Sequence, residues 1–284
     1  VEKTLGMTDL PLLSEPNLQQ QLVEIGYQGK KLEELESLSA AKKANMLFIV
    51  QDPYTSYYDA KVIRDFVALT QKLGFSPILL PFKPNGKAMH IKGFLTRFSK
   101  TAKTQAEFLN RVAKLNVPLV GVDPAIVLSY RDEYKEALGD SRGDFHVLTA
   151  HEWLTNQLES NALQSVVKNI AKSDGTFEWH LFPHCTESTF MPNSPKEWQN
   201  IFAQFGQTLT VEKVGCCGMA GVFGHEVQNQ TMSKDIYDVS WGKKLQGKDP
   251  NHCLATGYSC RSQVKRYEKA ILKHPVQALL EILD

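Results

Sequence analysis

The sequence predicts an α/β protein made of two related halves, each built on a parallel sheet with helices on both faces. Three observations carry this prediction. Short apolar runs alternate with helical stretches, turns containing glycine or proline separate them, and the whole pattern occurs twice along the chain. The 284 residues provide enough chain for one large or two smaller hydrophobic cores.

Composition and charge narrow the class of protein. The chain is 42% hydrophobic and 22% charged, which is ordinary for a soluble globular protein. Its net charge of +1 lacks the excess of positive charge that is typical of nucleic-acid-binding proteins. No apolar run approaches the roughly 20 residues of a membrane span. Neither a signal-peptide core nor an initiator Met is present at the N-terminus. We expect a cytoplasmic piece of a longer polypeptide, with no nucleic-acid partner and no transmembrane segment.

Three regions follow one another in this prediction. Residues 1–43 form a polar helical segment, residues 44–160 a first α/β repeat, and residues 175–284 a second repeat. In the first repeat, strands are expected at 45–52, 75–82 and 117–122, with helices at 57–74 and 123–138. Asp123 is the expected N-cap of the last helix and Pro124 its first residue.

The second repeat follows the same order. Strands are expected at 178–185, 208–215 and 252–257, and helices at 195–206, 234–245 and 258–271. An offset of about 133 residues places Asp52 against Cys185 and the KPNG turn against the CCG turn, which we interpret as an internal duplication. Ligands of parallel sheets bind beyond the carboxyl ends of the strands. The turns of each repeat should therefore line a common site.

The cysteines occur only in the second repeat. An odd number of them, without export signals, argues against a disulfide framework, and the neighbours Cys216 and Cys217 would form a strained bridge. Cys185, Cys216, Cys217 and Cys260 all fall at expected strand ends, whereas Cys253 is equally well explained as a small buried residue. This convergence predicts one local site.

Thiolates are soft ligands that suit iron–sulfur clusters and zinc. The glycines around Cys216 and Cys217 allow the backbone to approach the sulfur atoms closely. The long spacings between the cysteines match neither zinc fingers nor ferredoxin-type runs, so spacing leaves the metal open. His184 and His225 flank the cysteines and are candidate ligands or proton donors, although an ordinary structural hydrogen bond explains each equally well.

The order Cys185, then CCG at 216–218, then a final cysteine turn resembles the cysteine-rich CCG domain. That domain occurs in heterodisulfide reductase, in the iron–sulfur component of glycolate oxidase and in anaerobic glycerol-3-phosphate dehydrogenase. The stretches CCGMAGVFGHE and ATGYSCRSQVKR are similar to the C-terminal region of large FAD-linked oxidases of the D-lactate and D-2-hydroxyglutarate dehydrogenase type. The resemblance covers the chain from about residue 45.

The family motif carries over only in part. Cys185, Cys216, Cys217 and Cys260 match its cysteines, whereas Gly257 stands where the terminal CxxC has its first cysteine. Cys253 lies outside the pattern and is either an additional ligand or a core residue. The first repeat has lost every motif cysteine, with Asp52 at the first position, so the resemblance implies at most one cluster site.

The resemblance implies an electron-transfer module of an FAD-dependent D-2-hydroxyacid dehydrogenase, not catalytic by itself. It implies an iron–sulfur cluster here, with FAD-binding and ferredoxin-like domains elsewhere on the same polypeptide and an acceptor such as a quinone. Attachment to the inner face of the membrane would be peripheral. A zinc-binding or metal-free docking module is the alternative. Thiol–disulfide chemistry at Cys216 and Cys217 is less favoured, because no CxxC pair survives.

Overall fold

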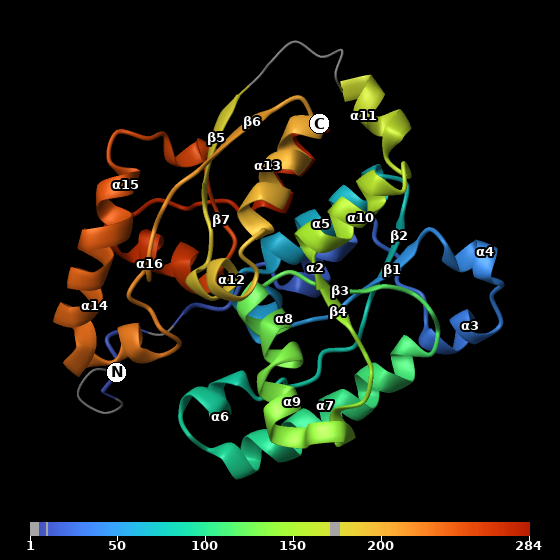
Figure 1. The fold of residues 1–284 in the computed structure, drawn as a ribbon, viewed down its shortest axis with the longest axis horizontal. Helices are drawn as coiled ribbons and strands as arrows, with labels where there is room; N and C mark the ends of the chain where they lie inside the picture. Colours follow the sequence, from blue (N-terminus) through green and yellow to red (C-terminus); the bar gives the residue numbers. More distant parts are fainter. Residues whose placement is uncertain (1–5, 10, 171–176) are drawn as a thin grey trace. The chain divides into compact units, whose positions relative to one another are not determined.

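A computed structural model describes residues 6–9, 11–170 and 177–284, and the chain divides into two compact units (Figure 1). The first unit comprises Leu13–Gln157 and Leu283. The second unit comprises the described residues up to Leu12, together with Leu158–Ile282 and Asp284. Each unit has its own parallel sheet, and each is described separately.

The first unit contains a four-stranded sheet in the order β2-β1-β3-β4, with every pair parallel. Its strands are β1 (Met46–Ile49), β2 (Ser76–Leu79), β3 (Leu119–Gly121) and β4 (Val147–Thr149). Its helices are α2 (Leu18–Glu24), α3 (Leu32–Glu36), α4 (Ala40–Lys43), α5 (Ala60–Lys72), α6 (Lys87–Ile91), α7 (Leu95–Ala113), α8 (Pro124–Arg131), α9 (Glu133–Leu138) and α10 (Ala150–Glu159). Single helical turns of other types occupy Tyr54–Tyr58 and Gly139–Arg142.

The central strand β1 is buried on both faces. Phe48 packs in one cluster with Phe98 and Leu109 of α7. Because successive side chains of a strand point to opposite faces, Leu47 and Ile49, which are also fully buried, face the other side of the sheet. Burial on both faces explains the unbroken apolar run at this strand, as in other parallel sheets.

The helix that follows β3 begins as predicted and ends earlier. Asp123 accepts hydrogen bonds from the backbone N–H groups of Ala125 and Ile126, and Pro124 occupies the first turn of α8. The predicted single helix is divided at Asp132, which separates α8 from α9. Strand β4 has no counterpart among the predicted elements, because its short apolar stretch follows His146 and runs directly into α10 at Ala150, with no turn residue between them.

The second unit contains a three-stranded parallel sheet in the order β6-β5-β7. Its strands are β5 (Glu178–Phe182), β6 (Thr208–Val211) and β7 (Cys253–Ala255). Its helices are α11 (Gln164–Ile170), α12 (Cys185–Phe190), α13 (Ser194–Gln204), α14 (Gln230–Tyr237), α15 (Lys243–Leu245), α16 (Tyr258–Glu268) and α17 (Pro275–Ile282). Shorter turns of other helix types occupy Phe223–His225, Val227–Asn229, Asp238–Gly242 and Pro250–His252.

The two sheets share a topology, which agrees with the predicted duplication. In each sheet, the first strand along the chain lies in the centre, the second pairs on one side of it and the third on the other. Thus β1 corresponds to β5, β2 to β6 and β3 to β7, while β4 is an addition to the first unit. The predicted α/β class with two parallel sheets is confirmed.

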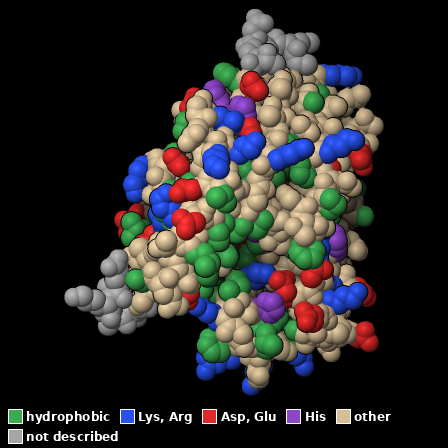
Figure 2. Space-filling view, turned by 60° about the vertical axis from the view of Figure 1, so that its left-hand side comes forward, with side chains coloured by type: hydrophobic (Ala, Val, Ile, Leu, Met, Phe, Trp, Pro, Cys, Tyr) green, Lys and Arg blue, Asp and Glu red, His purple; other side chains and the backbone are tan. Residues whose placement is uncertain are grey.

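The surface carries charges of both signs. Figure 2 shows Lys and Arg side chains interspersed with Asp and Glu on the face that it presents, in keeping with the net charge of +1. Within the described part of the chain, no helix combines the length and the apolar character that crossing a membrane requires.

Candidate metal centre

Four cysteines lie at the carboxyl edge of the second unit's sheet. Cys185 is the first residue of α12 and follows β5, and Cys260 lies in the first turn of α16, after β7. Cys216 and Cys217 belong to the loop that follows β6. The predicted convergence follows from the topology, because parallel strands bring their carboxyl ends to one edge.

The four thiols contact one another in a row. The side chain of Cys185 interacts with that of Cys216, and that of Cys216 with that of Cys217. Cys217 in turn interacts with Cys260, which also acts on Cys185. Cys217 and Cys260 are buried, whereas Cys185 and Cys216 are partly exposed, so solvent reaches the row at one end only. All five cysteines of the chain are free thiols.

The contacts concentrate negative charge on one sulfur. Hydrogen bonds from Cys185 and Cys217 lower the pKa of Cys216 strongly, and the backbone N–H of Gly218 adds a bond to its sulfur at 3.3 Å. The same bonds, together with burial, raise the pKa of Cys185 and of Cys217. Among the thiols of this row, Cys216 is therefore the one whose surroundings most favour the thiolate form.

The cysteine loop is fixed from behind by α14 and α16. The hydroxyl of Ser233 donates to the carbonyl of Gly218 at 2.8 Å, and the amide of Gln263 donates to the same hydroxyl at 2.8 Å. Both side chains are fully buried. Gly218 has φ +84°, where glycine is favoured, and a Cβ there would lie 2.2 Å from the carbonyl oxygen of Ser233.

A second pair of contacts fixes the start of the loop. The backbone N–H of Gly215 donates to Ser240 Oγ at 2.7 Å, and the indole of Trp241 donates to the carbonyl of Gly215 at 3.1 Å. Trp241 is fully buried and packs against Phe182 with their ring centres 5.2 Å apart. The row of thiols thus stands on a loop whose two ends are both hydrogen-bonded to side chains.

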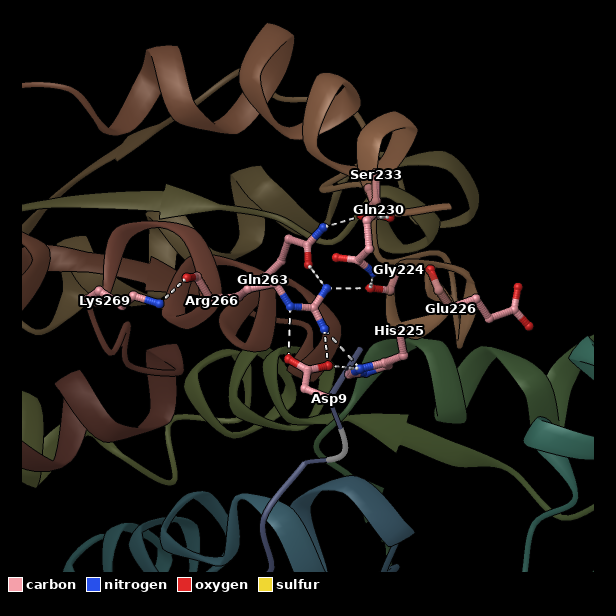
Figure 3. A network of polar contacts seen from close by, with 10 residues as sticks. Asp9, Gly224, His225, Glu226, Gln230, Ser233, Gln263, Arg266 and Lys269 are labelled. Atoms are coloured by element: carbon pink, nitrogen blue, oxygen red, sulfur yellow. Dashed lines mark hydrogen bonds and ion pairs between the residues drawn. The ribbon is translucent and has the colours of Figure 1, made fainter. Parts of the chain in front are cut away.

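His225 lies in a separate polar network, drawn in Figure 3. Its Nδ1 lies 2.7 Å from the carboxylate of Asp9 and 2.9 Å from the guanidinium of Arg266. Arg266 also donates to Asp9 and to the carbonyl of Gly224 (Figure 3). The predicted role of His225 as a ligand stays a prediction, and its described contacts connect residues 6–9 to the end of the cysteine loop.

His184 lies directly beside the thiols. It caps α12, with its Nδ1 accepting the backbone N–H of Thr186 at 3.2 Å, and its Nε2 lies 3.3 Å from Ser259 Oγ. Its own backbone N–H donates to Thr256 Oγ1 at 2.9 Å, which ties the end of β5 to the end of β7. It also acts electrostatically on Cys216. Of the two predicted histidines, His184 is therefore the one at the sulfur row.

Cys253 stands apart from the row. It lies within β7 and is fully buried, and burial raises its pKa to about 11, against the influence of nearby Lys248. The other groups that act on it are Glu212 and Asp249. It belongs to the same apolar cluster as Phe182 and Trp241, which favours the core alternative that the sequence left open.

The donor set suits a sulfur-ligated group. Four thiols in contact, one of them favoured as thiolate, provide the soft ligands that iron–sulfur clusters and zinc prefer. Among the residues that the structure describes, no three His, Cys, Asp or Glu side chains are placed to hold one metal ion. The interactions among the thiols are pairwise, and Cys260 also acts electrostatically on Cys185.

Sequence reasoning did not find the residues that hold the loop. Ser233, Ser240, Trp241, Gln263 and Arg266 lie on helical stretches that show only the ordinary amphipathic pattern. Ser233, Trp241 and Gln263 are polar or aromatic residues at fully buried positions. A pattern of apolar residues along the sequence does not reveal such positions.

Comparison with known proteins identifies close relatives of the whole chain, although no protein-family model matches it. The chain is 82% identical over 283 residues to D-2-hydroxyglutarate dehydrogenase of Haemophilus influenzae, of which it spans 28%. It is 58% identical over 282 residues to the protein of the same name in Escherichia coli K12, of which it spans 27%. Both matches cover at least 99% of this chain.

A more distant similarity points to a second oxidoreductase. The chain is 22% identical over 234 residues to a component of the anaerobic glycerol-3-phosphate dehydrogenase of Escherichia coli K12, covering 81% of this chain and 57% of that protein. The first relatives are oxidoreductases by name, and each is several times longer than the region that matches. The chain is thus homologous, over essentially its whole length, to one part of proteins named D-2-hydroxyglutarate dehydrogenase.

Proposed function

We propose that this chain is the electron-transfer module of an FAD-dependent D-2-hydroxyacid dehydrogenase and that it holds an iron–sulfur cluster. Cys185, Cys216, Cys217 and Cys260 would be the ligands. The observation that carries the proposal is the row of four contacting thiols at the carboxyl edge of a parallel sheet. Homology to dehydrogenases named for a 2-hydroxyacid supports the assignment to an oxidoreductase.

The protein's own residues have separable tasks in this proposal. When bound, the cluster supplies a site for single electrons. Hydrogen bonds already stabilise the thiolate form of Cys216, which is the form that ligates metal. Ser233 and Trp241 hold the two ends of the loop, so the backbone that carries Cys216 and Cys217 is fixed before any metal arrives. Burial of Cys217 and Cys260 keeps water away from the inner half of the site.

The remaining assignments concern the longer protein. The chain spans little more than a quarter of its relatives, so the FAD site and the hydroxyacid pocket would lie outside it. FAD-binding and ferredoxin-like domains of the same polypeptide would deliver electrons to the thiol site, and an acceptor such as a quinone would receive them. A cytoplasmic location, with peripheral attachment to the membrane, is part of the same proposal.

The first experiment measures iron, acid-labile sulfide and zinc in anaerobically purified protein, together with visible and EPR spectra. We expect iron and sulfide in matching amounts and an absorbance that bleaches on reduction. Cys216→Ser and Cys217→Ser should each lose the iron and the spectrum. Cys253→Ser is the matched control: this cysteine lies within β7, and burial, not a neighbouring thiol, is the main cause of its raised pKa, so the iron content should stay unchanged.

The longer protein then tests the role in electron transfer. Cys216→Ser should leave reduction of the flavin by the hydroxyacid intact and abolish transfer to an external acceptor. Loss of flavin reduction in a folded variant would contradict a role confined to electron transfer. Stoichiometric zinc without sulfide, removable by a chelator with a loss of stability, would replace the proposal by the alternative of a zinc-bound docking module.

A further inference from the structure

The side chain of His184 and the backbone of Gly257 compete for one volume. A Cβ added to Gly257 would lie 2.3 Å from Cδ2 and 2.9 Å from Cγ of the His184 ring. Cβ atoms in proteins essentially never come this close to a non-bonded atom. The imidazole therefore fills the space into which a side chain at position 257 would point. His184 is 7% exposed, so the residue is almost completely enclosed by its surroundings.

Backbone conformation does not explain the glycine at this position. Gly257 has φ −90° and ψ 137°, an extended conformation that any residue adopts. In the same loop system, Gly218 is required by its φ of +84° as well as by space. Glycine at 257 is therefore required by the neighbouring ring alone.

The orientation of the ring follows from its hydrogen bonds. The backbone N–H of Thr186 donates to Nδ1 at 3.2 Å, so in the neutral imidazole the proton lies on Nε2. This N–H faces Ser259 Oγ at 3.3 Å, next to Cys260 in the first turn of α16. A ring held at Nδ1 in this way presents its donor to Ser259, the residue before Cys260, and has no free acceptor nitrogen for a metal.

We propose that His184 is a positioning residue of the thiol site, whose imidazole replaces a side chain at position 257 and presents an N–H donor beside the sulfur row. The ring then limits the site to four sulfur ligands and leaves His184 itself outside the ligand set. A fixed N–H donor near the sulfurs makes a bound centre easier to reduce. The effect on reduction rests on the proposed function. The competition of the His184 ring with a side chain at position 257 for the same space does not.

The competition for space between the His184 ring and a side chain at position 257 is tested on metal-free protein by a double-mutant cycle. Gly257→Ala should lower the melting temperature clearly in the natural background, because its methyl group meets the ring. In a His184→Ala background the same change should lower the melting temperature much less. The loss of the α12 cap affects both variants of that background equally, so the cycle cancels it. Gly215→Ala is the control in the cysteine loop, since its Cβ would make only ordinary contact, 3.6 Å from Ser240 Oγ. An equal cost of Gly257→Ala in both backgrounds would overturn the proposal.

The donor role is tested on iron-loaded protein by redox titration and by pulsed EPR with ¹⁵N-histidine. His184→Asn keeps a good helix cap and removes the ring N–H. We expect an unchanged iron content and a more negative midpoint potential than in the natural protein, with no nitrogen coupling typical of a directly bound imidazole. Loss of iron, an unchanged potential or strong nitrogen coupling would each contradict the donor role. If the natural protein binds no iron, the proposed function fails, and the stability cycle still decides where the ring sits.

Discussion

The carbonyl group of Ser233 blocks the space beside Gly218 while the hydroxyl of the same residue holds the Gly218 carbonyl at 2.8 Å. One residue of α14 thus both fixes the cysteine loop and excludes a side chain from it. This dual contact leaves no space for a side chain after the cysteine pair, and it gives the loop a fixed backbone for its sulfur atoms.

Gly218→Ala is expected to destabilise the second unit severely. The positive φ costs about 1–3 kcal/mol for a residue with a side chain, and the contact of the new Cβ with the Ser233 carbonyl adds to this. Chemical unfolding followed by tryptophan fluorescence measures the loss. Gly247→Ala is the matched control, because Gly247 has a similar φ of +76° and no atom within 4 Å of a new Cβ. Equal losses in the two variants would show that the Ser233 contact contributes nothing.

The first unit is expected to lose stability as pH rises from about 4 to about 7. Burial, followed by the charge of Asp123, raises the pKa of Asp52 from 3.8 to about 7. Between these values the folded chain keeps a proton that the unfolded chain has lost, so every rise in pH favours unfolding. Asp52→Asn keeps the acceptor for the N–H groups of Tyr54 and Thr55 and removes the titration.

Denaturant unfolding at pH 5 and pH 8 checks this expectation. The natural protein should be less stable at pH 8 than at pH 5, and Asp52→Asn should reduce that difference. Asp140→Asn provides a control at an exposed carboxylate of the same unit. If Asp52→Asn leaves the pH dependence as it was, the buried carboxyl does not carry it.

Arg266→Lys is expected to loosen residues 6–9 while the rest of the second unit keeps its fold. The guanidinium bonds Asp9, Gly224 and His225 at once, and a lysine ammonium cannot reach all three. The backbone bonds from Thr8 N–H to His225 and from Val227 N–H to Gly6 report on this contact directly. Hydrogen exchange at these two amides should accelerate by roughly tenfold, which corresponds to about 1.4 kcal/mol.

Lys265→Arg, one residue away on an exposed position of α16, is the control and should leave both amides protected. Exchange that stays slow in Arg266→Lys would mean that the backbone pairing between Met7 and Glu226 holds the segment without the side-chain network.

The sequence predicts the fold well where burial is regular. The run at 45–52 reads as a strand because both faces of β1 are buried, and the Asp123–Pro124 pair marks the start of α8 because local hydrogen bonds suffice to cap it. The same reasoning misses β4, which runs directly into α10 with no turn residue between them. It also misses the division at Asp132, where no glycine or proline marks the end of a helix.

The location of the cysteine site could be predicted from the topology of the sheet. The contacts that orient its residues could not, because they depend on tertiary structure. Cysteines at strand ends of a parallel sheet must meet at one edge, which is why the positions of Cys185, Cys216 and Cys260 indicate a common site. The contacts that orient the loop join residues far apart in sequence, such as Asp9 with Arg266, and no local pattern encodes them. The close approach of the His184 ring to Gly257 likewise depends on how the ends of β5 and β7 lie side by side.

Trp241→Phe is expected to expose the inner thiols of the row. The indole donates to the Gly215 carbonyl at 3.1 Å, and phenylalanine would leave that carbonyl without this bond and a void beside Phe182. The unpaired group alone costs about 1–3 kcal/mol. Because the bond fixes the start of the cysteine loop, Cys217, only 3% exposed, should react several-fold faster with a thiol reagent, as resolved by peptide mass spectrometry. Trp153→Phe removes a similar buried volume in the first unit, which has no cysteine, and should leave the labelling of Cys217 unchanged. Equal acceleration in both variants would mean that general loss of stability, and not release of the loop at Gly215, controls access to the thiols.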